Sequence, residues 1–472
     1  MPRGITIVGL GPGEPGLLTM EAWQILQGVN EIYVRTREHP TVQALPPSAA
    51  IHSFDDVYER ADTFEEVYAE IASRVIELGN RAEGVIYAVP GHPLVGEASV
   101  QRILTLAEQR GLAVRIVEGL SFVEPVCSQL KLDPLDGLQI ADATELALLH
   151  YPQFNADLPV LIGQLYSRDL AADVKLVLMM LYPDEHEITL IRAAGTEHES
   201  IRAIPLHELD RSQEIDHLTS LYVPPLSEAG SLPAFQEVVA RLRAPGGCPW
   251  DREQTHRSLR PFLLEETYEV LQALDGEEIT CLKEELGDLL LQILLHTQIA
   301  IEQGEFQMAD VVSHIVSKLK RRHPHVFGQA QVSSAQEVLV NWERIKGEEK
   351  HHEEGILSGI PHSLPALARA QALQRRAAQI GIDWPEIEDV WTKIEEQWQE
   401  LREVAPGGAG EAKLGDVLFS LVNLASRLHI DAESALREAV VRFERRFLDM
   451  ERECAAREKE RTGLEPTELD EL

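Results

Sequence analysis

The chain has 472 residues, of which 44% are hydrophobic, and its 78 acidic and 43 basic residues give a formal net charge of −35. At about 100–200 residues per domain, this length predicts two to four domains. A chain this negative repels DNA and anionic membranes, so we expect neither a nucleic acid nor a membrane as a partner. A small anionic substrate fits the charge if local cations or metal ions offset it.

The cysteine spacing and the N-terminal residues indicate in which cellular compartment the protein is expected. Cys127, Cys248, Cys281 and Cys454 lie far apart and form no Cys-x-x-Cys pair. This spacing argues against a zinc ribbon or a disulfide framework and fits a reducing environment. The opening MPRGITIVGLGPGEPG has a short apolar run broken by glycines, which is not the pattern of a signal peptide. We therefore expect a cytoplasmic protein.

Residues 1–226 have the pattern of an α/β domain. Short β-branched runs predict strands over 5–10, 84–89, 114–117, 159–162, 175–181 and 188–191. Helical patterns lie between several of them, over 64–78 and 98–110. The segment YVPPL at 222–226 and the EAGSLP that follows at 228 form a Pro/Gly/Ser-rich break, where we place the end of this domain.

Beyond this break, long amphipathic helices replace the strands. The apolar spacing of a buried helix face is carried by Leu282, Leu286, Leu289, Leu290, Ile293 and Leu294. Gly304 is placed to cap this helix. Residues 265–291 resemble 395–419, and the break SGIPHSLP at 358–365 separates the two copies. We therefore predict an all-α region with two related units, 227–357 and 358–472.

Two pairs of acidic residues stand out in the first helical unit. Glu266 and Glu269 are three positions apart, and so are Glu285 and Asp288. On a helix, positions with this spacing share one face. An Asp-Gly turn at 275–276 lies between the pairs, so the two helices can pack antiparallel with both pairs facing each other.

Four converging carboxylates need protons or cations to neutralise them. An all-oxygen anionic site suits Mg²⁺ or Mn²⁺, and the Glu-x-x-Asp spacing differs from the Glu-x-x-His of di-iron bundles. The alternative is a solvated acidic face, because acid pairs are common in so acidic a chain. We favour the metal site, because both pairs border a strongly apolar stripe on consecutive helices.

A basic block follows, made of Lys318, Lys320, Arg321 and Arg322. Cations near a metal–carboxylate site suit a polyphosphate ligand, but the same residues also fit the last turn of a helix that ends at Pro324. Trp250 could stack on a nucleobase or pack in a turn. Trp342 and Lys346, in the segment NWERIK, carry the same ambiguity.

The motifs GGCPWDREQTH, LLEETYEVLQAL, LKEELGDLLLQILLH and KLKRRHPHVFG make the sequence similar to the MazG family over about residues 230–460. MazG proteins are all-α pyrophosphohydrolases. The resemblance implies Mg²⁺-dependent cleavage of nucleoside and deoxynucleoside triphosphates to the monophosphate and pyrophosphate, and it also implies a homodimer. Such an enzyme would serve nucleotide-pool house-cleaning.

The resemblance also implies roles for residues at matching positions. The metal ligands would be Glu266, Glu269, Glu285 and Asp288. Glu265 would order or activate water, and either Glu265 or Glu269 would act as the general base. The residues that meet the substrate would be Trp250, Lys320, Arg321, Arg322 and Lys346.

The N-terminal half resembles the SAM-dependent tetrapyrrole (corrin/porphyrin) methylases, through GLGPG after the first predicted strand, VPGHP at 89–93 and GLSF at 119–122. The resemblance implies S-adenosylmethionine-binding loops that contain Gly9, Gly11, Pro12, Gly13, Gly91, His92, Pro93 and Ser121. Many of these methylases have Gly-Asp-Pro where this chain has Gly-His-Pro. From the residues alone the glycines also fit tight turns, because Glu14 leaves the GxGxxG pattern unsatisfied.

The whole chain thus resembles YabN-type fusions of a tetrapyrrole methylase-like domain to MazG. We expect its second helical unit to be inactive: aligned on Leu-Gly-Asp, Lys413 stands where Glu285 does, and Gln397 takes the position of Glu266. The leading hypothesis is a triphosphate pyrophosphohydrolase. The alternatives are a SAM-dependent methyltransferase, or a hydrolase whose N-terminal half only binds SAM or mediates dimerisation.

Overall fold

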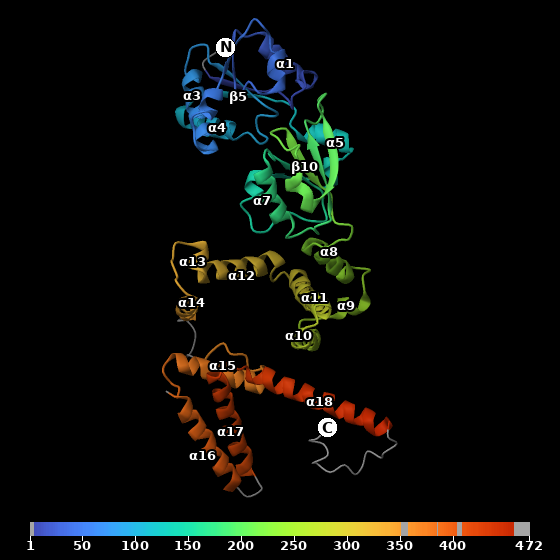
Figure 1. The fold of residues 1–472 in the computed structure, drawn as a ribbon, viewed down its shortest axis with the longest axis vertical. Helices are drawn as coiled ribbons and strands as arrows, with labels where there is room; N and C mark the ends of the chain where they lie inside the picture. The colour runs from blue at the N-terminus through green and yellow to red at the C-terminus, as the bar shows by residue number, and fades with distance from the viewer. Residues whose placement is uncertain (1–3, 351–356, 385, 404–407, 457–472) are drawn as a thin grey trace. The chain divides into compact units, whose positions relative to one another are not determined.

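A computed structural model describes residues 4–350, 357–384, 386–403 and 408–456 (Figure 1). Its internal contacts divide the chain into two compact units, Met1–Cys248 and Pro249–Leu472. The first unit contains two sheets, and the described part of the second is helical. The boundary predicted after residue 226 stays a prediction. None of the helices in the described ranges is long and apolar enough to cross a membrane.

The first sheet is parallel, with strand order β3-β2-β4-β1-β5. Its strands and nearby helices are β1 (Ile5–Gly9), η1 (Pro15–Leu17), α1 (Met20–Gln27), β2 (Glu31–Val34), η2 (Pro40–Ala44), β3 (Ala50–Ser53), α2 (Asp55–Tyr58), α3 (Phe64–Gly79), β4 (Val85–Val89), α4 (Ala98–Arg110) and β5 (Val114–Val117). In β1, Ile5 pairs with Val85 of β4 and Val114 of β5. Helices α3 and α4 pack on one face, and α1 packs on the other. Burial on both faces explains the continuous apolar runs of β1 and β4, which lie at positions predicted as strands.

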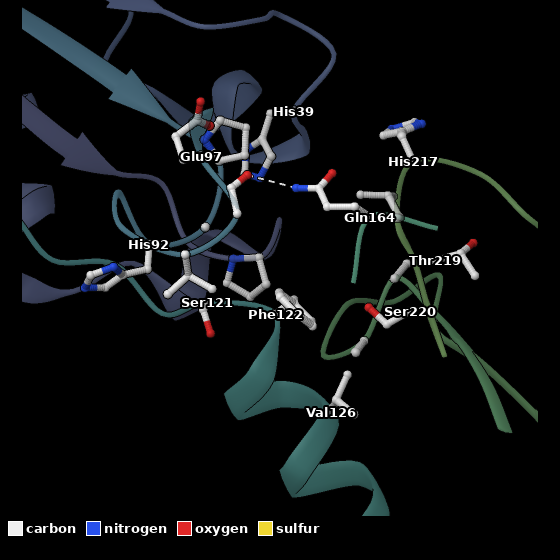
Figure 2. A pocket seen from close by; sticks show the side chains of 18 of the residues that line it. His39, His92, Glu97, Ser121, Phe122, Val126, Gln164, His217, Thr219 and Ser220 are labelled. Atoms are coloured by element: carbon white, nitrogen blue, oxygen red, sulfur yellow. Dashed lines mark hydrogen bonds between the residues drawn. The ribbon is translucent and has the colours of Figure 1, made fainter. Parts of the chain in front are cut away.

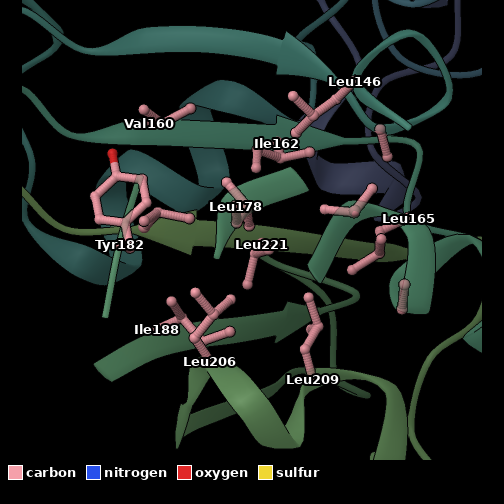
Figure 3. Packing of buried hydrophobic residues seen from close by; sticks show 14 of the residues in the cluster. Leu146, Val160, Ile162, Leu165, Leu178, Tyr182, Ile188, Leu206, Leu209 and Leu221 are labelled. Carbon is pink, nitrogen blue, oxygen red and sulfur yellow. The ribbon is translucent and has the colours of Figure 1, made fainter. Parts of the chain in front are cut away.

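The second sheet is mixed, with strand order β6-β7-β10-β8-β9. Its elements are α5 (Val123–Leu130), η3 (Pro134–Asp136), β6 (Gln139–Asp142), α6 (Ala143–Leu146), β7 (Val160–Gly163), α7 (Arg168–Leu178), β8 (Glu187–Arg192), β9 (Ser200–Pro205), η4 (Leu206–Arg211) and β10 (Thr219–Val223). Figure 3 shows the core between this sheet, α7 and η4, where Ile162, Leu178 and Leu221 are fully buried. The two sheets confirm the α/β fold predicted for the N-terminal half.

One predicted strand, 175–181, is wrong, because residues 175–178 form the last turn of α7 and residues 179–181 form the turn that follows it. Ser167 begins this helix, and its side chain accepts a hydrogen bond from the Leu170 amide. The buried positions Ala171, Val174 and Leu178 follow a helical rather than an alternating spacing. The β-branched residues of this segment are therefore one apolar stripe of a helix.

The remaining elements are helices. They are α8 (Leu232–Arg243), α9 (Pro249–Glu253), α10 (Arg260–Asp275), α11 (Ile279–Gln303), α12 (Met308–Arg322), α13 (Pro324–Phe327), α14 (Ala335–Lys350), α15 (Ala366–Gln379), α16 (Ile387–Glu403), α17 (Gly408–Arg427) and α18 (Ala432–Ala456). Gly304 ends α11 in the left-handed conformation, with φ of 71°, which confirms the predicted cap. Helix α10 packs against α11, and α16 packs against α17, so each predicted repeat contains a helical hairpin.

Several helices of the second unit leave apolar side chains exposed. On α12, the exposed apolar residues are Val311, Val312, Ile315, Val316 and Leu319. Their spacing places them along one side of the helix. This row of five residues is called the α12 stripe below. A contiguous apolar surface of this kind is typical of an interface.

Candidate metal centre and ligand cleft

The hairpin of α10 and α11 brings three of the predicted acidic residues together. Glu266 projects from α10, while Glu285 and Asp288 project from α11, one helical turn apart. One carboxylate oxygen from each residue lies within 4.8 Å of the other two, and all three side chains are half-buried. Glu269 lies beside the cluster, hydrogen-bonded to Glu266, and is more exposed. Glu265 is also exposed, one position before Glu266.

The cluster is electrostatically unfavourable without a cation. Burial raises the pKa of Glu266, and so do its hydrogen bond to the Glu269 carboxylate and the charges of Asp288, Glu269 and Glu265. Partial desolvation likewise raises the pKa of Glu285, together with the charges of Glu269 and Asp288. Raised pKa values mean that the ionised carboxylates repel one another. A hard divalent cation fits this all-oxygen donor set and would relieve that repulsion.

The basic block lies at the end of α12. Lys320 and Arg321 are exposed, and the Arg322 guanidinium lies 5.5 Å from the centre of the Trp342 ring. Helix α12 packs against α13 and α14, and the phosphate-binding role of its basic block stays a prediction.

Two further predicted substrate residues are Trp250 and Lys346. Trp250 on α9 is 52% exposed and packs edge-on against Phe262, with ring centres 5.7 Å apart. This contact supports the packing interpretation, while the exposed face leaves room for stacking on a base. Lys346 belongs to α14, and its side chain lies outside the described residues.

The corresponding place in the second repeat holds an ion pair. The Lys413 ammonium contacts the Glu400 carboxylate, and the Ser420 hydroxyl donates to Gln397 Oε1 over 2.6 Å. The hydrogen bond and charge of Lys413 lower the pKa of Glu400, and those of Glu400 raise the pKa of Lys413. In the described part of this repeat, no three acidic, His or Cys side chains converge as they do in the first.

The first unit contains a polar cleft where the loops of the first sheet face the second sheet (Figure 2). The predicted cofactor residues in its lining are Pro12, Gly91, His92 and Ser121. The others, Gly9, Gly11, Gly13 and Pro93, lie outside that lining. Gly9 instead supports the loops: a Cβ there would lie 2.6 Å from the Gly91 carbonyl oxygen and 2.7 Å from the Gly119 nitrogen. This close approach requires glycine.

Sequence reasoning missed several residues that line this cleft. These are Arg35, His39, Glu97, Gln164, His217, Thr219 and Ser220. Arg35 directly follows β2, and Glu97 directly precedes α4. Ligand-facing residues collect at the carboxyl ends of parallel strands. Because β2 was not among the predicted strands, the position of Arg35 at such an end could not be predicted.

A buried polar network stiffens one side of the cleft. The Arg35 guanidinium donates to Glu97 over 2.9 Å, Ser99 donates to the other Glu97 oxygen over 2.7 Å, and the Ser99 and Tyr87 hydroxyls lie 2.8 Å apart. Burial lowers the pKa of His39 to about 4, helped by the charge of Arg35. His39 is therefore neutral near pH 7, and its Nδ1 has no partner in the described structure.

Comparison with known proteins gives separate matches for the N-terminal α/β part and for the helical part of the chain. Residues 4–210 match the model of the tetrapyrrole (corrin/porphyrin) methylases, and residues 254–327 match that of the MazG nucleotide pyrophosphohydrolase domain. The protein thus belongs to the class in which a methylase-like α/β domain is followed by a MazG domain. The segment matched by the MazG model contains all four carboxylates.

Relatives define the family more closely. The YabN protein of Bacillus subtilis is 40% identical over 100% of this chain and 98% of its own length. A nucleoside triphosphate pyrophosphohydrolase of Escherichia coli K12 is 45% identical over 50% of this chain and 92% of its own. A pyrophosphohydrolase of Thermotoga maritima is 44% identical over 48% and 88%. The chain belongs to the YabN family of methylase–MazG fusions.

Proposed function

We propose that the protein is a nucleoside triphosphate pyrophosphohydrolase that converts NTP or dNTP to the monophosphate and pyrophosphate. One observation carries the proposal: the ligand oxygens of Glu266, Glu285 and Asp288 converge within 4.8 Å, inside the segment matched by the MazG model. The pyrophosphohydrolase names of the E. coli and T. maritima relatives support it. Such an activity suits the cleaning of nucleotide pools.

The three carboxylates, with Glu269, would hold Mg²⁺, and Mn²⁺ fits the same oxygen donors. The bound cation supplies charge neutralisation and substrate orientation. Glu269, which is exposed and hydrogen-bonded to Glu266, would accept a proton from the attacking water. Glu265, exposed at the cluster's edge, is the second candidate for this general base. Attack on the α-phosphorus would release pyrophosphate.

The substrate-binding residues remain part of the proposal. Positive charge for the leaving pyrophosphate would come from Lys320, Arg321 and Arg322. The other proposed substrate-binding residues are Trp250 and Lys346. The α12 stripe and the basic block lie on the same helix, which supports a homodimer in which a second copy covers α12. The proposed setting is the cytoplasm, with no nucleic acid or membrane as a partner.

The test is an NTP panel with Mg²⁺ and identification of the products. Monophosphate with pyrophosphate is the expected outcome, and diphosphate with phosphate contradicts the proposal. The chain offers a matched pair of variants, Asp288→Ala and Asp416→Ala, at equivalent positions of the two repeats. Only the first should lose turnover.

A second candidate function belongs to the first unit. We propose that its cleft binds S-adenosylmethionine, either for methyl transfer or as a regulatory ligand. Support comes from the presence of Pro12, Gly91, His92 and Ser121 in one lining and from the methylase match. Gly11 has φ of 71°, and a Cβ there would lie 3.2 Å from the Leu17 carbonyl oxygen. Calorimetry should detect SAM binding to the wild type and none to Gly11→Val, while NTP hydrolysis persists.

A further inference from the structure

A pair of histidines that the proposed hydrolysis does not use joins the segment before α10 to α11. His256 lies in the loop between α9 and α10, and His296 lies on α11, eight residues or about 12 Å along the helix from Asp288. Their Nδ1 atoms are 2.8 Å apart, and the ring planes differ by 4°. Two nitrogens at this distance share a proton, so one ring donates and the other accepts. This hydrogen bond between two titratable groups is called the histidine clasp below.

The histidine clasp attaches the loop before α10, and with it α9, to α11. The Gln254 side chain donates to the Trp250 carbonyl over 3.0 Å and accepts from the Ser258 hydroxyl over 2.7 Å. These two bonds connect the turn that carries His256 to α9, where the Trp250 ring packs against Phe262. A change at the clasp therefore reaches Trp250 through a short chain of contacts.

A separate apolar anchor holds α10 itself. Leu259, the residue directly before α10, is fully buried, and α10 packs along α11. These contacts do not involve the two imidazoles. Loss of the clasp would therefore loosen residues 249–258 and leave the packing of the α10–α11 hairpin in place.

The clasp cannot persist when both rings are protonated. Each Nδ1 then carries a hydrogen, so neither nitrogen can accept, and two positive charges face each other. The Nε2 atom of His296 is buried and has no hydrogen-bond partner among the described residues. Because an imidazolium carries a hydrogen on this nitrogen as well, protonation of His296 leaves a buried donor unsatisfied.

The surroundings of His296 oppose its protonation. Burial and the charge of His256 lower the pKa of His296. The charged residues nearest to the pair in sequence, which do not contribute to this shift, are Glu253, Arg257, Arg260, Asp288 and Glu302. Because the pKa is lowered by folding, the contribution of His296 to stability is complete above its ordinary value of 6.5 and is lost as the pH falls below that value.

We propose that the histidine clasp is a proton-sensitive device that holds residues 249–258 on α11 near neutral pH and releases them in mild acid. Trp250, a proposed substrate residue, is 52% exposed on this segment. Its release should weaken the binding of a triphosphate more than it slows turnover, because the carboxylate cluster stays assembled. This link to the substrate rests on the proposed hydrolysis, whereas the release itself does not.

His256→Asn and His256→Phe form a matched pair of variants. The Asn side chain offers both a donor and an acceptor close to the position of Nδ1, so it can bond His296 in either protonation state and should keep the segment attached in acid. Phe retains a ring of similar shape but has no hydrogen-bonding group, so it should release the segment at every pH. Neither variant alters a proposed metal ligand.

The experiment is hydrogen–deuterium exchange of the full-length proteins in EDTA at pH 7.5 and pH 5.5. Comparing the proteins at one pH cancels the intrinsic dependence of exchange on pH. At pH 7.5, residues 249–258 should exchange equally slowly in the wild type and in His256→Asn, and about fivefold faster in His256→Phe, the effect of one hydrogen bond. At pH 5.5 the wild type should exchange as fast as His256→Phe, while His256→Asn stays slow.

A kinetic measurement with Mg²⁺ tests the link to the substrate. From pH 7.5 to pH 5.5, the KM of the wild type for a triphosphate should rise about fivefold relative to that of His256→Asn, with no change in the ratio of their kcat values. Expected exchange behaviour in a protein that hydrolyses no triphosphate would support the clasp and contradict only the proposed hydrolysis.

Three results would overturn the clasp. The first is equal exchange of the wild type and His256→Asn at both pH values, because the bond would then not respond to protons. The second is exchange in folded His256→Phe as slow as in the wild type at pH 7.5, because the bond would then hold nothing. The third is a pH response that appears only with added Zn²⁺, which would make the pair a metal site. A cooperative thermal transition establishes that each variant is folded.

Discussion

Each of the two helical repeats contains a helical hairpin, α10–α11 in the first and α16–α17 in the second. The first hairpin holds a cluster of acidic side chains, and the second holds an ion pair. In the first, Glu266, Glu285 and Asp288 converge with no counter-ion from the described chain. In the second, Lys413 lies against Glu400, and Gln397 is hydrogen-bonded to Ser420. The Lys413 ammonium supplies the second hairpin with the positive charge that the proposed metal ion would supply to the first. Differences at a few side chains thus distinguish the two hairpins: an acidic cluster in the first and an ion pair in the second.

The largest expected effect is on catalysis. Asp288→Ala should lower turnover at least about a hundredfold, because it removes a proposed metal ligand, while Asp416→Ala should change it less than about twofold. Quantifying pyrophosphate and monophosphate for both variants measures this difference. A folded Asp416→Ala protein without activity would reverse the roles of the two repeats.

The next effect is on stability. Mg²⁺ that binds only the folded cluster should stabilise it by about 2.7 kcal/mol at one hundred times its Kd. Calorimetry should show a rise of several degrees in the melting temperature of the helical unit. The rise should disappear in Asp288→Ala and persist in Asp416→Ala. An equal rise in all three proteins would place the cation elsewhere.

A third experiment converts one hairpin into the other. The double substitution Gln397→Glu with Lys413→Glu restores the acids of the first repeat at equivalent positions. We expect an additional Mg²⁺ site, weaker than the first because its surroundings were not selected for a cation, seen as increased stoichiometry in metal titration. Gln397→Glu with Lys413→Gln, which leaves one acid fewer, should bind distinctly less. Unchanged stoichiometry in both would show that the backbones differ in a way the side chains do not reveal.

The smallest effect concerns pH in the absence of metal. Because the folded-state pKa of Glu266 is raised, folding binds extra protons, and this contribution to stability is present at low pH and lost as pH rises above the ordinary value of 4.5. In EDTA, Glu266→Gln should therefore melt higher than the wild type at pH 7, with the difference shrinking toward pH 4. Saturating Mg²⁺ should reverse its sign at pH 7. A pH-independent difference would mean that the four acids do not interact.

Features that depend on residues close together in the sequence were predicted better than features that depend on the strand order of a sheet. The convergence of Glu266, Glu285 and Asp288 follows from a spacing of three residues and a short turn, so a local pattern sufficed to predict it. Aligning the repeats also placed Lys413 at the position of Glu285, and in the structure its ammonium pairs with Glu400. The catalytic and metal-binding roles of the acidic residues in the first repeat stay predictions.

The cleft of the first unit was less accessible to sequence reasoning. Arg35, Glu97 and Gln164 come from separate elements, and only the strand order brings them to one cavity. β2 has only four residues, too few for its alternation to be distinctive. The wrong strand at 175–181 has a related cause, since a β-branched run fits either a strand or one side of a helix until its packing partner is known.

Through the α12 stripe, the proposed homodimer would make the behaviour of this protein depend on its concentration. Apolar side chains held in water cost free energy in proportion to their area, and a second copy removes that cost only when it is present at sufficient concentration. By mass action, the melting temperature of the helical unit should rise between about 0.5 and 50 µM protein. Specific activity measured at high dilution should fall for the same reason. Val312→Lys on this stripe should remove the concentration dependence while leaving the carboxylate cluster intact.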